Sequence, residues 1–77
     1  MESIFIINKF EDGYTMDDMY DDVYAQESYC TEVLEIPDEK INATQMIGNG
    51  FLEVVLADID QDEIDEDWYV NLSRLSS

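Results

Sequence analysis

Carboxylates are the side chains of this sequence whose number and spacing could do chemistry. Twenty of the 77 residues are Asp or Glu, whereas three are Lys or Arg and none is His, so the formal net charge is −17. Carboxylates can hold a metal ion, work in pairs as acid and base, or accept hydrogen bonds from the cations of a partner. Each of these chemistries requires a different spacing of the acids.

The nearest approach to a metal-binding motif begins at Asp58. Asp58, Asp60 and Asp62 occupy the first, third and fifth positions of a calcium-loop pattern. The pattern then fails, because Glu63 stands where glycine is needed and Tyr69 stands where a bidentate Glu is needed. We therefore predict no dedicated metal site and no cofactor.

Enzyme chemistry is not expected either. The lone Cys30 has no histidine to activate it, and the sequence contains no nucleophile-elbow or phosphate-binding glycine motif. A chain of this length also leaves little room for a concave pocket beside its core. We interpret the protein as a non-enzyme, and Cys30 as a small buried apolar residue in a reducing cytoplasm.

The remaining chemistry is recognition of cations, and the net charge limits the classes of molecule that could be the partner. Nucleic acid and anionic membranes are excluded as direct ligands because both are polyanions. The N-terminal apolar run is too short for a signal peptide or a membrane span. A basic protein surface is the expected partner, although a solvated face that keeps a small protein soluble is the simpler alternative.

Two groups of acids are predicted to accept hydrogen bonds from Lys and Arg of that partner. The first acidic cluster consists of Asp17, Asp18, Asp21 and Asp22. The second acidic cluster consists of Asp58, Asp60, Asp62, Glu63, Asp65, Glu66 and Asp67. Four tyrosines among the acids could either contact the partner's cations or line the core, namely Tyr14, Tyr20, Tyr24 and Tyr29.

The elements that must position these acids are predicted to form one α+β domain over residues 1–77, with about three strands and two or three short helices. Apolar and β-branched runs predict strands over residues 3–10, 29–36 and 51–59. Apolar residues at helical spacing predict a helix over 16–27, or as far as 30, capped by Thr15. On that helix Asp17 would lie beside Asp21, and Asp18 beside Asp22.

The second half of the chain leaves more room for alternatives. Pro37 and Asp38 predict the start of a short helix over 38–47, and the Gly48-Asn49-Gly50 turn either ends it or forms a tight hairpin. An apolar stripe of Ile64, Trp68, Leu72 and Leu75 then favours a C-terminal helix capped by Asp60. The competing prediction is a strand over residues 67–73, with the acids in a loop.

A chain this short buries only a small core, so a homodimer is also expected. Nine apolar residues are assigned to the core or to dimer contacts: Ile4, Ile6, Val23, Leu34, Phe51, Val54, Leu56, Trp68 and Leu72.

In size, charge and α+β pattern, the chain resembles the phage-encoded DNA-mimic inhibitors, which include anti-restriction, anti-CRISPR and uracil-glycosylase-inhibitor proteins. The resemblance is one of composition and covers the acidic stretches TMDDMYDDVYAQE and DIDQDEIDEDW. It implies a cytoplasmic inhibitor, commonly dimeric, that blocks the DNA-binding surface of a host defence or DNA-processing protein. The alternative is an acidic immunity protein of bacteria, which would neutralise one cognate basic nuclease toxin by the same electrostatics.

Overall fold

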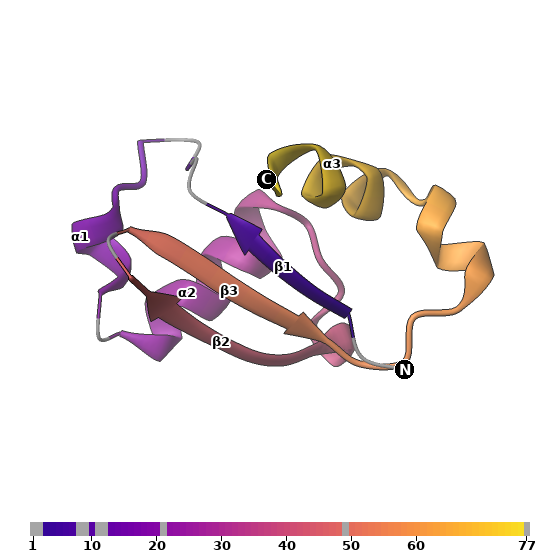
Figure 1. The fold of residues 1–77 in the computed structure, drawn as a ribbon, viewed down its shortest axis with the longest axis horizontal. Coiled ribbons are helices and arrows are strands. Elements are labelled where there is room, and N and C mark those ends of the chain that lie inside the picture. The colour runs from indigo at the N-terminus through magenta and orange to yellow at the C-terminus, as the bar shows by residue number, and fades with distance from the viewer. Residues whose placement is uncertain (1–2, 8–9, 11–12, 21, 49, 77) are drawn as a thin grey trace.

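A three-stranded antiparallel sheet with helices packed on one face organises the protein (Figure 1). The computed structural model describes residues 3–7, 10, 13–20, 22–48 and 50–76. Along the chain the elements are β1 Ser3–Ile7, α1 Met16–Met19, α2 Val23–Ser28, the π-helical segment η1 Tyr29–Val33, the 3₁₀ turn η2 Asp38–Lys40, β2 Ile41–Ile47, β3 Phe51–Leu56, the 3₁₀ segment η3 Gln61–Asp65 and α3 Asp67–Leu75. The predicted α+β class is confirmed.

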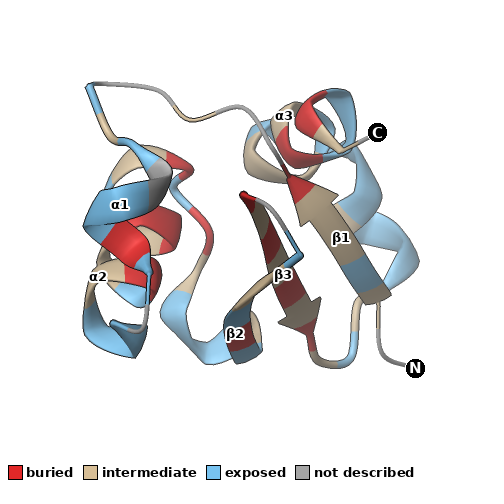
Figure 2. Cartoon of the chain, turned by 60° about the vertical axis from the view of Figure 1, so that its left-hand side comes forward, coloured by how far each residue is buried: buried red, intermediate tan, exposed pale blue. Residues whose placement is uncertain are grey.

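β3 is the central strand, and β1 and β2 pair with it on either side. The strands expected over 3–10 and 51–59 are therefore found, in shorter form, as β1 and β3; Asn8 and Lys9 lie outside the described residues. Along β3 every second side chain is buried, as the alternating colours of Figure 2 show. The buried side chains of β3 are Leu52, Val54 and Leu56, all without solvent exposure.

The helices cover the same face of the sheet from two sides. α2 contacts β2, and α3 contacts β1. Leu72 and Leu75 of α3 are buried in the core, where Met19, Tyr29, Cys30 and the inward side chains of β3 also lie. Three members of the predicted apolar stripe, Trp68, Leu72 and Leu75, therefore pack against the core. Its fourth member, Ile64, does not, because it lies on η3 before the helix begins and is 42% exposed.

The single helix predicted over 16–27 is wrong, because the chain breaks after α1. Tyr20 is extended, with a ψ of 127°, and Asp22 starts α2 by accepting a 3.0 Å hydrogen bond from the backbone N–H of Ala25. An Asp that caps a new helix competes with the continuation of the old one. Asp18 and Asp22 consequently lie on different helical elements and not one turn apart, while Asp21 is outside the described residues.

The strand predicted over 29–36 is also wrong, because the segment continues α2 as a π-helical turn. The N–H of Leu34 donates to the carbonyl of Tyr29, five residues earlier, at 3.1 Å. This wider turn lets Tyr29, Cys30 and Leu34 all face the core. Glu35 then takes the left-handed conformation, with a φ of 59°, and ends the helix.

The helix predicted over 38–47 is wrong beyond its first turn. Only η2 is helical, and the residues after it form β2, which pairs with β3 along its length. The hairpin alternative for the glycine-rich turn is confirmed: Gly48 and Gly50 have positive φ values of 56° and 98° between the two strands. Positive φ values are the conformation for which glycine is preferred in such turns.

The helical prediction for the C-terminal third is confirmed for residues 67–75, and the competing strand is wrong. The acidic stretch before it forms η3, whose first residues are held by a capping interaction: the N–H of Asp60 donates to Glu63 Oε1 at 3.1 Å. Asp60 therefore caps the short 3₁₀ segment, and α3 begins seven residues later, at Asp67. None of the described helices is long and apolar enough to cross a membrane.

Four of the residues assigned to the core are buried there: Leu34, Val54, Leu56 and Leu72. Ile6, Phe51 and Trp68 are half-buried. Ile4 and Val23 are not core residues, because 60% and 56% of their surfaces are exposed.

Candidate partner-binding surface

The first acidic cluster is built on the starts of two short helices. Asp17 and Asp18 lie in the first turn of α1, and Asp22 precedes α2; all three are exposed. Asp18 Oδ2 accepts hydrogen bonds from the backbone N–H of Thr15 at 2.9 Å and from its hydroxyl at 3.1 Å. Because the side chains of Asp18 and Asp22 accept hydrogen bonds from the local backbone at these helix starts, their carboxylates are held in fixed orientations.

The second acidic cluster lies on η3 and on the segments that flank it. Six of its members are exposed, whereas Glu63 is half-buried. Glu63 Oε1 lies 2.9 Å from Lys40 Nζ, and the same lysine donates to the carbonyl of Asp58 at 3.0 Å. This ion pair fastens η3 to the start of β2. It raises the pKa of Lys40 chiefly through the hydrogen bond to Glu63, and the same hydrogen bond, ahead of that from the Asp60 backbone, lowers the pKa of Glu63.

Because Glu63 is engaged within the chain, other members of the second cluster are better placed to meet a partner. Across residues 3–7, 10, 13–20, 22–48 and 50–76, four exposed members of this cluster make no side-chain hydrogen bond or ion pair: Asp62, Asp65, Glu66 and Asp67. In the first cluster, Asp17 is likewise exposed and makes no side-chain hydrogen bond or ion pair among the described residues.

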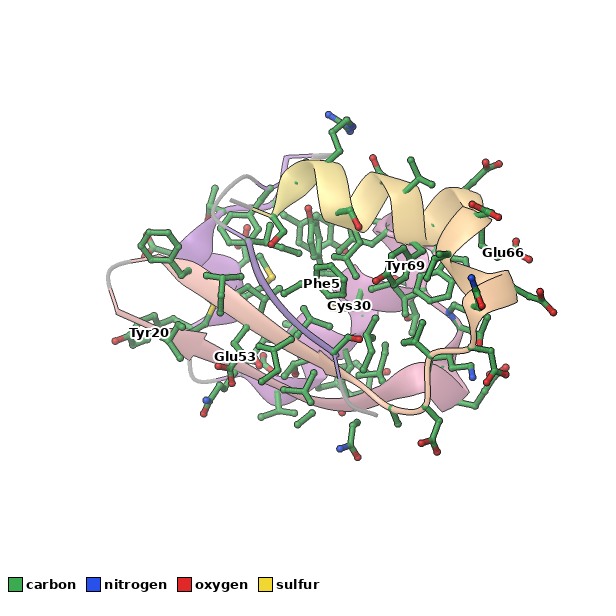
Figure 3. All side chains as sticks on the ribbon, turned by 45° about the vertical axis from the view of Figure 1, so that its right-hand side comes forward. Phe5, Tyr20, Cys30, Glu53, Glu66 and Tyr69 are labelled. Atoms are coloured by element: carbon green, nitrogen blue, oxygen red, sulfur yellow. The ribbon has the colours of Figure 1, made fainter. Side chains whose placement is uncertain are left out.

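The two clusters lie at opposite ends of the molecule. α1 stands at one end of the long axis and η3 at the other in Figure 1, and the labelled Tyr20 and Glu66 are similarly far apart in Figure 3. The principal extents of the backbone are 34, 21 and 20 Å. The structure therefore does not gather the predicted residues into one site but presents two acidic ends.

Few cations offset these ends in the described part of the chain. Lys40 is used in the ion pair with Glu63. Arg74 is exposed on the last turn of α3, where its Nη2 donates to Asn71 Oδ1 at 2.6 Å. Lys9 lies outside the described residues. The acidic surfaces are thus left largely unneutralised.

The four tyrosines divide between the surface and the core. Tyr20 and Tyr24 are 54% and 80% exposed on the segments that carry the first acidic cluster. Tyr29 is fully buried, and its ring packs edge-on against those of Phe10 and Tyr14 at centroid distances of 5.7 and 5.0 Å. Tyr29 therefore belongs to the core, while Tyr20 and Tyr24 are available to stack on a cation.

Two of the shallow grooves on the described surface are lined partly by α2. One of about 320 Å³ lies between α2 and β2 and has no carboxylate among its described lining residues, which are Tyr20, Val23, Gln26, Gln45 and Met46. The other, of about 250 Å³, is lined by Tyr24, Glu27, Ser28, Thr31, Glu32 and Asp38. No group of three or more Asp, Glu, His or Cys residues able to hold a metal ion is found within the described residues.

Cys30 is fully buried, as the sequence predicted. Burial, assisted by the charge of Glu27, raises the pKa of its thiol to about 12. The nucleophilic thiolate is therefore not formed at neutral pH.

Sequence reasoning assigned Ile4, Ile6 and Phe51 to the core or to dimer contacts but did not predict that they share the second face of the sheet, which none of the described helices covers. Figure 1 looks directly onto it, and Figure 3 shows Glu53 on it while Phe5 points the opposite way, into the core. Register places on this open face three cross-strand rows: Ile4–Val55–Ala43, Ile6–Glu53–Gln45 and Phe51–Ile47. A signal was present in the sequence, because FLEVVL is apolar at all three inward positions and at two of the three outward ones, Phe51 and Val55.

Comparison with known proteins gives no family for this chain: no family model, no curated protein and no solved structure matches it.

Proposed function

We propose that this protein is a non-enzymatic inhibitor that binds the basic, DNA-binding surface of another protein by imitating the charge of nucleic acid. The observation that carries the proposal is the density of exposed carboxylates along the molecule. A net charge of −17 is spread over a body 34 Å long. Duplex DNA of that length carries about 20 charges, at one per 1.7 Å. The charge per unit length is thus close to that of the duplex.

The way the acids are held supports mimicry over simple solubility. A solvated face needs no fixed orientation, but Asp18 and Asp22 are held by helix starts, and η3 is fastened by the Lys40–Glu63 pair. Carboxylates that are already in place lose less side-chain entropy on binding. Their role is to accept charge-assisted hydrogen bonds from Lys and Arg of the partner.

The expected partner is a host defence or DNA-processing protein with an extended basic groove. Charge of this density steers the encounter, so association is fast at low salt and weakens as salt screens it. Tyr20 and Tyr24 add aromatic faces beside the first acidic cluster for Arg or Lys. The cytoplasm, where such partners act, also suits the free thiol of Cys30.

The test is capture followed by competition with DNA. The tagged protein is immobilised, bacterial lysate is applied at low salt, and retained proteins are eluted with a salt gradient and identified by mass spectrometry. We expect one DNA-binding protein or complex to be retained, and to be released by duplex DNA. Retention of only a diffuse set of basic proteins, with no release by DNA, would contradict the proposal.

Variants make the test specific, because the structure shows which acids can be neutralised without removing a described hydrogen bond or ion pair. The second-cluster variant carries Asp62→Asn, Asp65→Asn, Glu66→Gln and Asp67→Asn. A control variant with the same change in net charge carries Glu27→Gln, Glu32→Gln, Glu35→Gln and Glu39→Gln, all exposed and outside both clusters. The second-cluster variant should lose the partner and the control should keep it. If the two variants bind the partner equally well, binding depends on net charge alone and not on the second acidic cluster.

The acidic immunity protein is the second candidate, and the compact group of Asp17, Asp22, Tyr20 and Tyr24 at one end of the molecule is the observation that favours it. A toxin would be bound through one small set of strong contacts, whereas a DNA mimic would use both ends. Asp17→Asn with Asp21→Asn, compared with the second-cluster variant, separates them. Loss of binding in both variants supports mimicry, while loss in the first alone, with a nuclease toxin retained, favours immunity.

A further inference from the structure

The groove between α2 and β2 differs in chemistry from the acidic surfaces on either side of it. Its described lining residues are Tyr20, Val23, Gln26, Gln45 and Met46, and none of these is charged. Tyr20 and Val23 are 54% and 56% exposed, so the groove presents apolar surface to solvent. Its volume of about 320 Å³ is at the small end of the range for ligand sites, about 300–1,000 Å³, and suits a single side chain.

The amide groups of the groove are better placed to accept hydrogen bonds than to donate them. Gln26 Nε2 already donates to the carbonyl of Met19 at 2.8 Å. Gln45 Nε2 already donates to Glu53 Oε1, also at 2.8 Å. Gln45 is exposed, and its Oε1 accepts no hydrogen bond among the described residues. A ligand that meets this oxygen must therefore bring a donor.

Carboxylates flank the groove on its helix side and on its sheet side. Asp22 directly precedes Val23 at the start of α2, and Glu53 is bonded to Gln45. Figure 3 shows Tyr20 and Glu53 toward the same end of the molecule. The negative charge on both sides favours a donor that is a cation over one that is neutral.

Arginine fits this combination of apolar walls, acceptor and charge better than lysine does. Its guanidinium has five donors and no acceptor, is weakly hydrated and stacks on aromatic rings, while its stem packs on apolar surface. A lysine ammonium is a strongly hydrated point charge, which gains less from apolar walls. Within the described chain Lys40 pairs with Glu63 and Arg74 donates to Asn71, so the arginine comes from another protein.

We propose that the groove between α2 and β2 binds one arginine side chain of a basic partner. The guanidinium stacks on the ring of Tyr20 and donates to Gln45 Oε1. The stem lies against Val23 and Met46. This inference rests on the proposed function only for the protein that supplies the arginine, because the site itself can be tested on the isolated chain.

Titration with N-acetyl-arginine N′-methylamide, followed by NMR, tests the site. At about 150 mM NaCl, which screens diffuse attraction, the probe should shift the signals of the Met46 methyl and the Gln45 side-chain amide until they saturate. The lysine analogue, and the neutral citrulline analogue that keeps the planar head without its charge, should bind at least about threefold more weakly. Equal binding of the arginine and lysine analogues, or shifts that are largest on η3 or at Thr31 in the second groove, would overturn the proposal.

The two exposed tyrosines provide a matched pair of variants. Tyr20→Leu removes the ring from the groove, whereas Tyr24→Leu removes a ring that is 80% exposed and is not among the groove's described lining residues. Tyr20→Leu should raise the dissociation constant of the arginine analogue about three- to tenfold. Tyr24→Leu, and Tyr20→Phe, which keeps the ring, should leave it unchanged. Equal effects of the two leucine variants would contradict the assignment, and circular dichroism verifies that each variant folds.

Failure of the groove and failure of the proposed function give different results. If the arginine analogue binds but no DNA-binding protein is captured from lysate, the groove is confirmed as a site and mimicry is wrong. If a DNA-binding protein is captured and released by DNA while the analogue does not bind, mimicry is supported and the arginine site is wrong.

Discussion

At the scale of single residues, the core contains one group whose chemistry is suppressed by its position. The Cys30 thiol is fully buried, and its pKa is raised to about 12 by burial and by the charge of Glu27. We predict that thiol reagents do not label the native protein at pH 8, because the thiolate is absent and the sulfur is inaccessible. In urea one thiol per chain should react. Rapid labelling of the native protein, measured by mass spectrometry, would show that the core opens readily.

The buried polar pair Gln26 and Thr44 makes a second prediction at this scale. Gln26 Nε2 donates to the carbonyl of Met19 at 2.8 Å, and the Thr44 hydroxyl donates to Gln26 Oε1 at 3.0 Å. Thr44→Val leaves Gln26 Oε1 without its donor, so it should lower the free energy of unfolding by about 1–3 kcal/mol. Urea unfolding followed by the fluorescence of Trp68, the single Trp, measures this loss.

The double variant Gln26→Met with Thr44→Val provides the control for that measurement. The double variant should lose less free energy of unfolding than the sum of the losses in Gln26→Met and Thr44→Val, because the second substitution removes a group that the first has already left unpaired. Strict additivity would mean that the two side chains stabilise the fold independently. Nothing in the sequence pointed to this pair, because a Gln and a Thr 18 residues apart meet only once β2 lies against α2.

At the scale of elements, sequence patterns identified the strands and helices that pack by a simple periodicity. β3 and α3 were predictable, since an apolar β-branched run and an apolar stripe at helical spacing each fit one structure. β2 was not, because its residues Asn42, Ala43, Gln45 and Met46 have no strong strand preference. Its conformation comes from pairing with β3 across the glycine turn, which is a tertiary effect.

The strand prediction for residues 29–36 was wrong for a related reason. Its Thr, Val and Ile favour a strand locally, but a π-helical turn brings Tyr29, Cys30 and Leu34 onto one buried face. Burial of three apolar side chains outweighs a local preference worth a fraction of a kilocalorie per residue. Periodicity at 3.6 or at 2 residues does not reveal a π turn.

The Lys40–Glu63 pair, which joins η3 to β2, predicts a pH dependence. The pKa of Glu63 is lowered in the folded protein, chiefly by its hydrogen bond with Lys40. Its contribution to stability is therefore present above the pKa of an unfolded glutamate, near 4.3, and is lost as pH falls through the lowered folded pKa. The raised pKa of Lys40 acts at the other extreme: its contribution is present below the unfolded lysine pKa and is lost as pH rises through the folded one.

The substitution Glu63→Gln tests the part of this pH dependence that occurs at low pH. The difference in unfolding free energy between the native protein and this variant should be constant from about pH 6 to pH 9 and shrink as pH falls below about 4. Urea titrations at a series of pH values measure it. Glu66→Gln, which removes an exposed acid with no hydrogen bond or ion pair among the described residues, should show no such change. A similar change in both variants would assign the effect to net charge rather than to the ion pair.

At the scale of the whole molecule, the two acidic clusters were predictable as residues but not as a surface. The sequence contains both acidic stretches, yet their placement at opposite ends of a 34 Å body depends on the strand order β1-β3-β2 and on which side α3 packs. The open face follows from the same topology. With both helical layers on one side, the molecule presents charge at its ends and an apolar face between them.

This distribution of charge predicts how stability depends on salt. At about 10 mM salt the screening length is about 30 Å, comparable to the 34 Å long axis, so the two acidic ends repel each other through the whole molecule. At about 150 mM it falls to about 8 Å, and only neighbouring acids still interact. The thermal unfolding midpoint should therefore rise steeply over this interval and change much less at higher salt.

Two controls test whether screening causes this rise in the unfolding midpoint. NaCl and tetramethylammonium chloride should act alike if screening is responsible, because screening depends on ionic strength and not on the identity of the cation. Measurement at one low micromolar protein concentration excludes any effect of self-association, since association makes the midpoint depend on protein concentration. A midpoint that rises with sodium but not with the bulky cation would instead indicate specific cation binding to the acids. A midpoint that does not respond to salt would mean that the native state relieves the repulsion in another way.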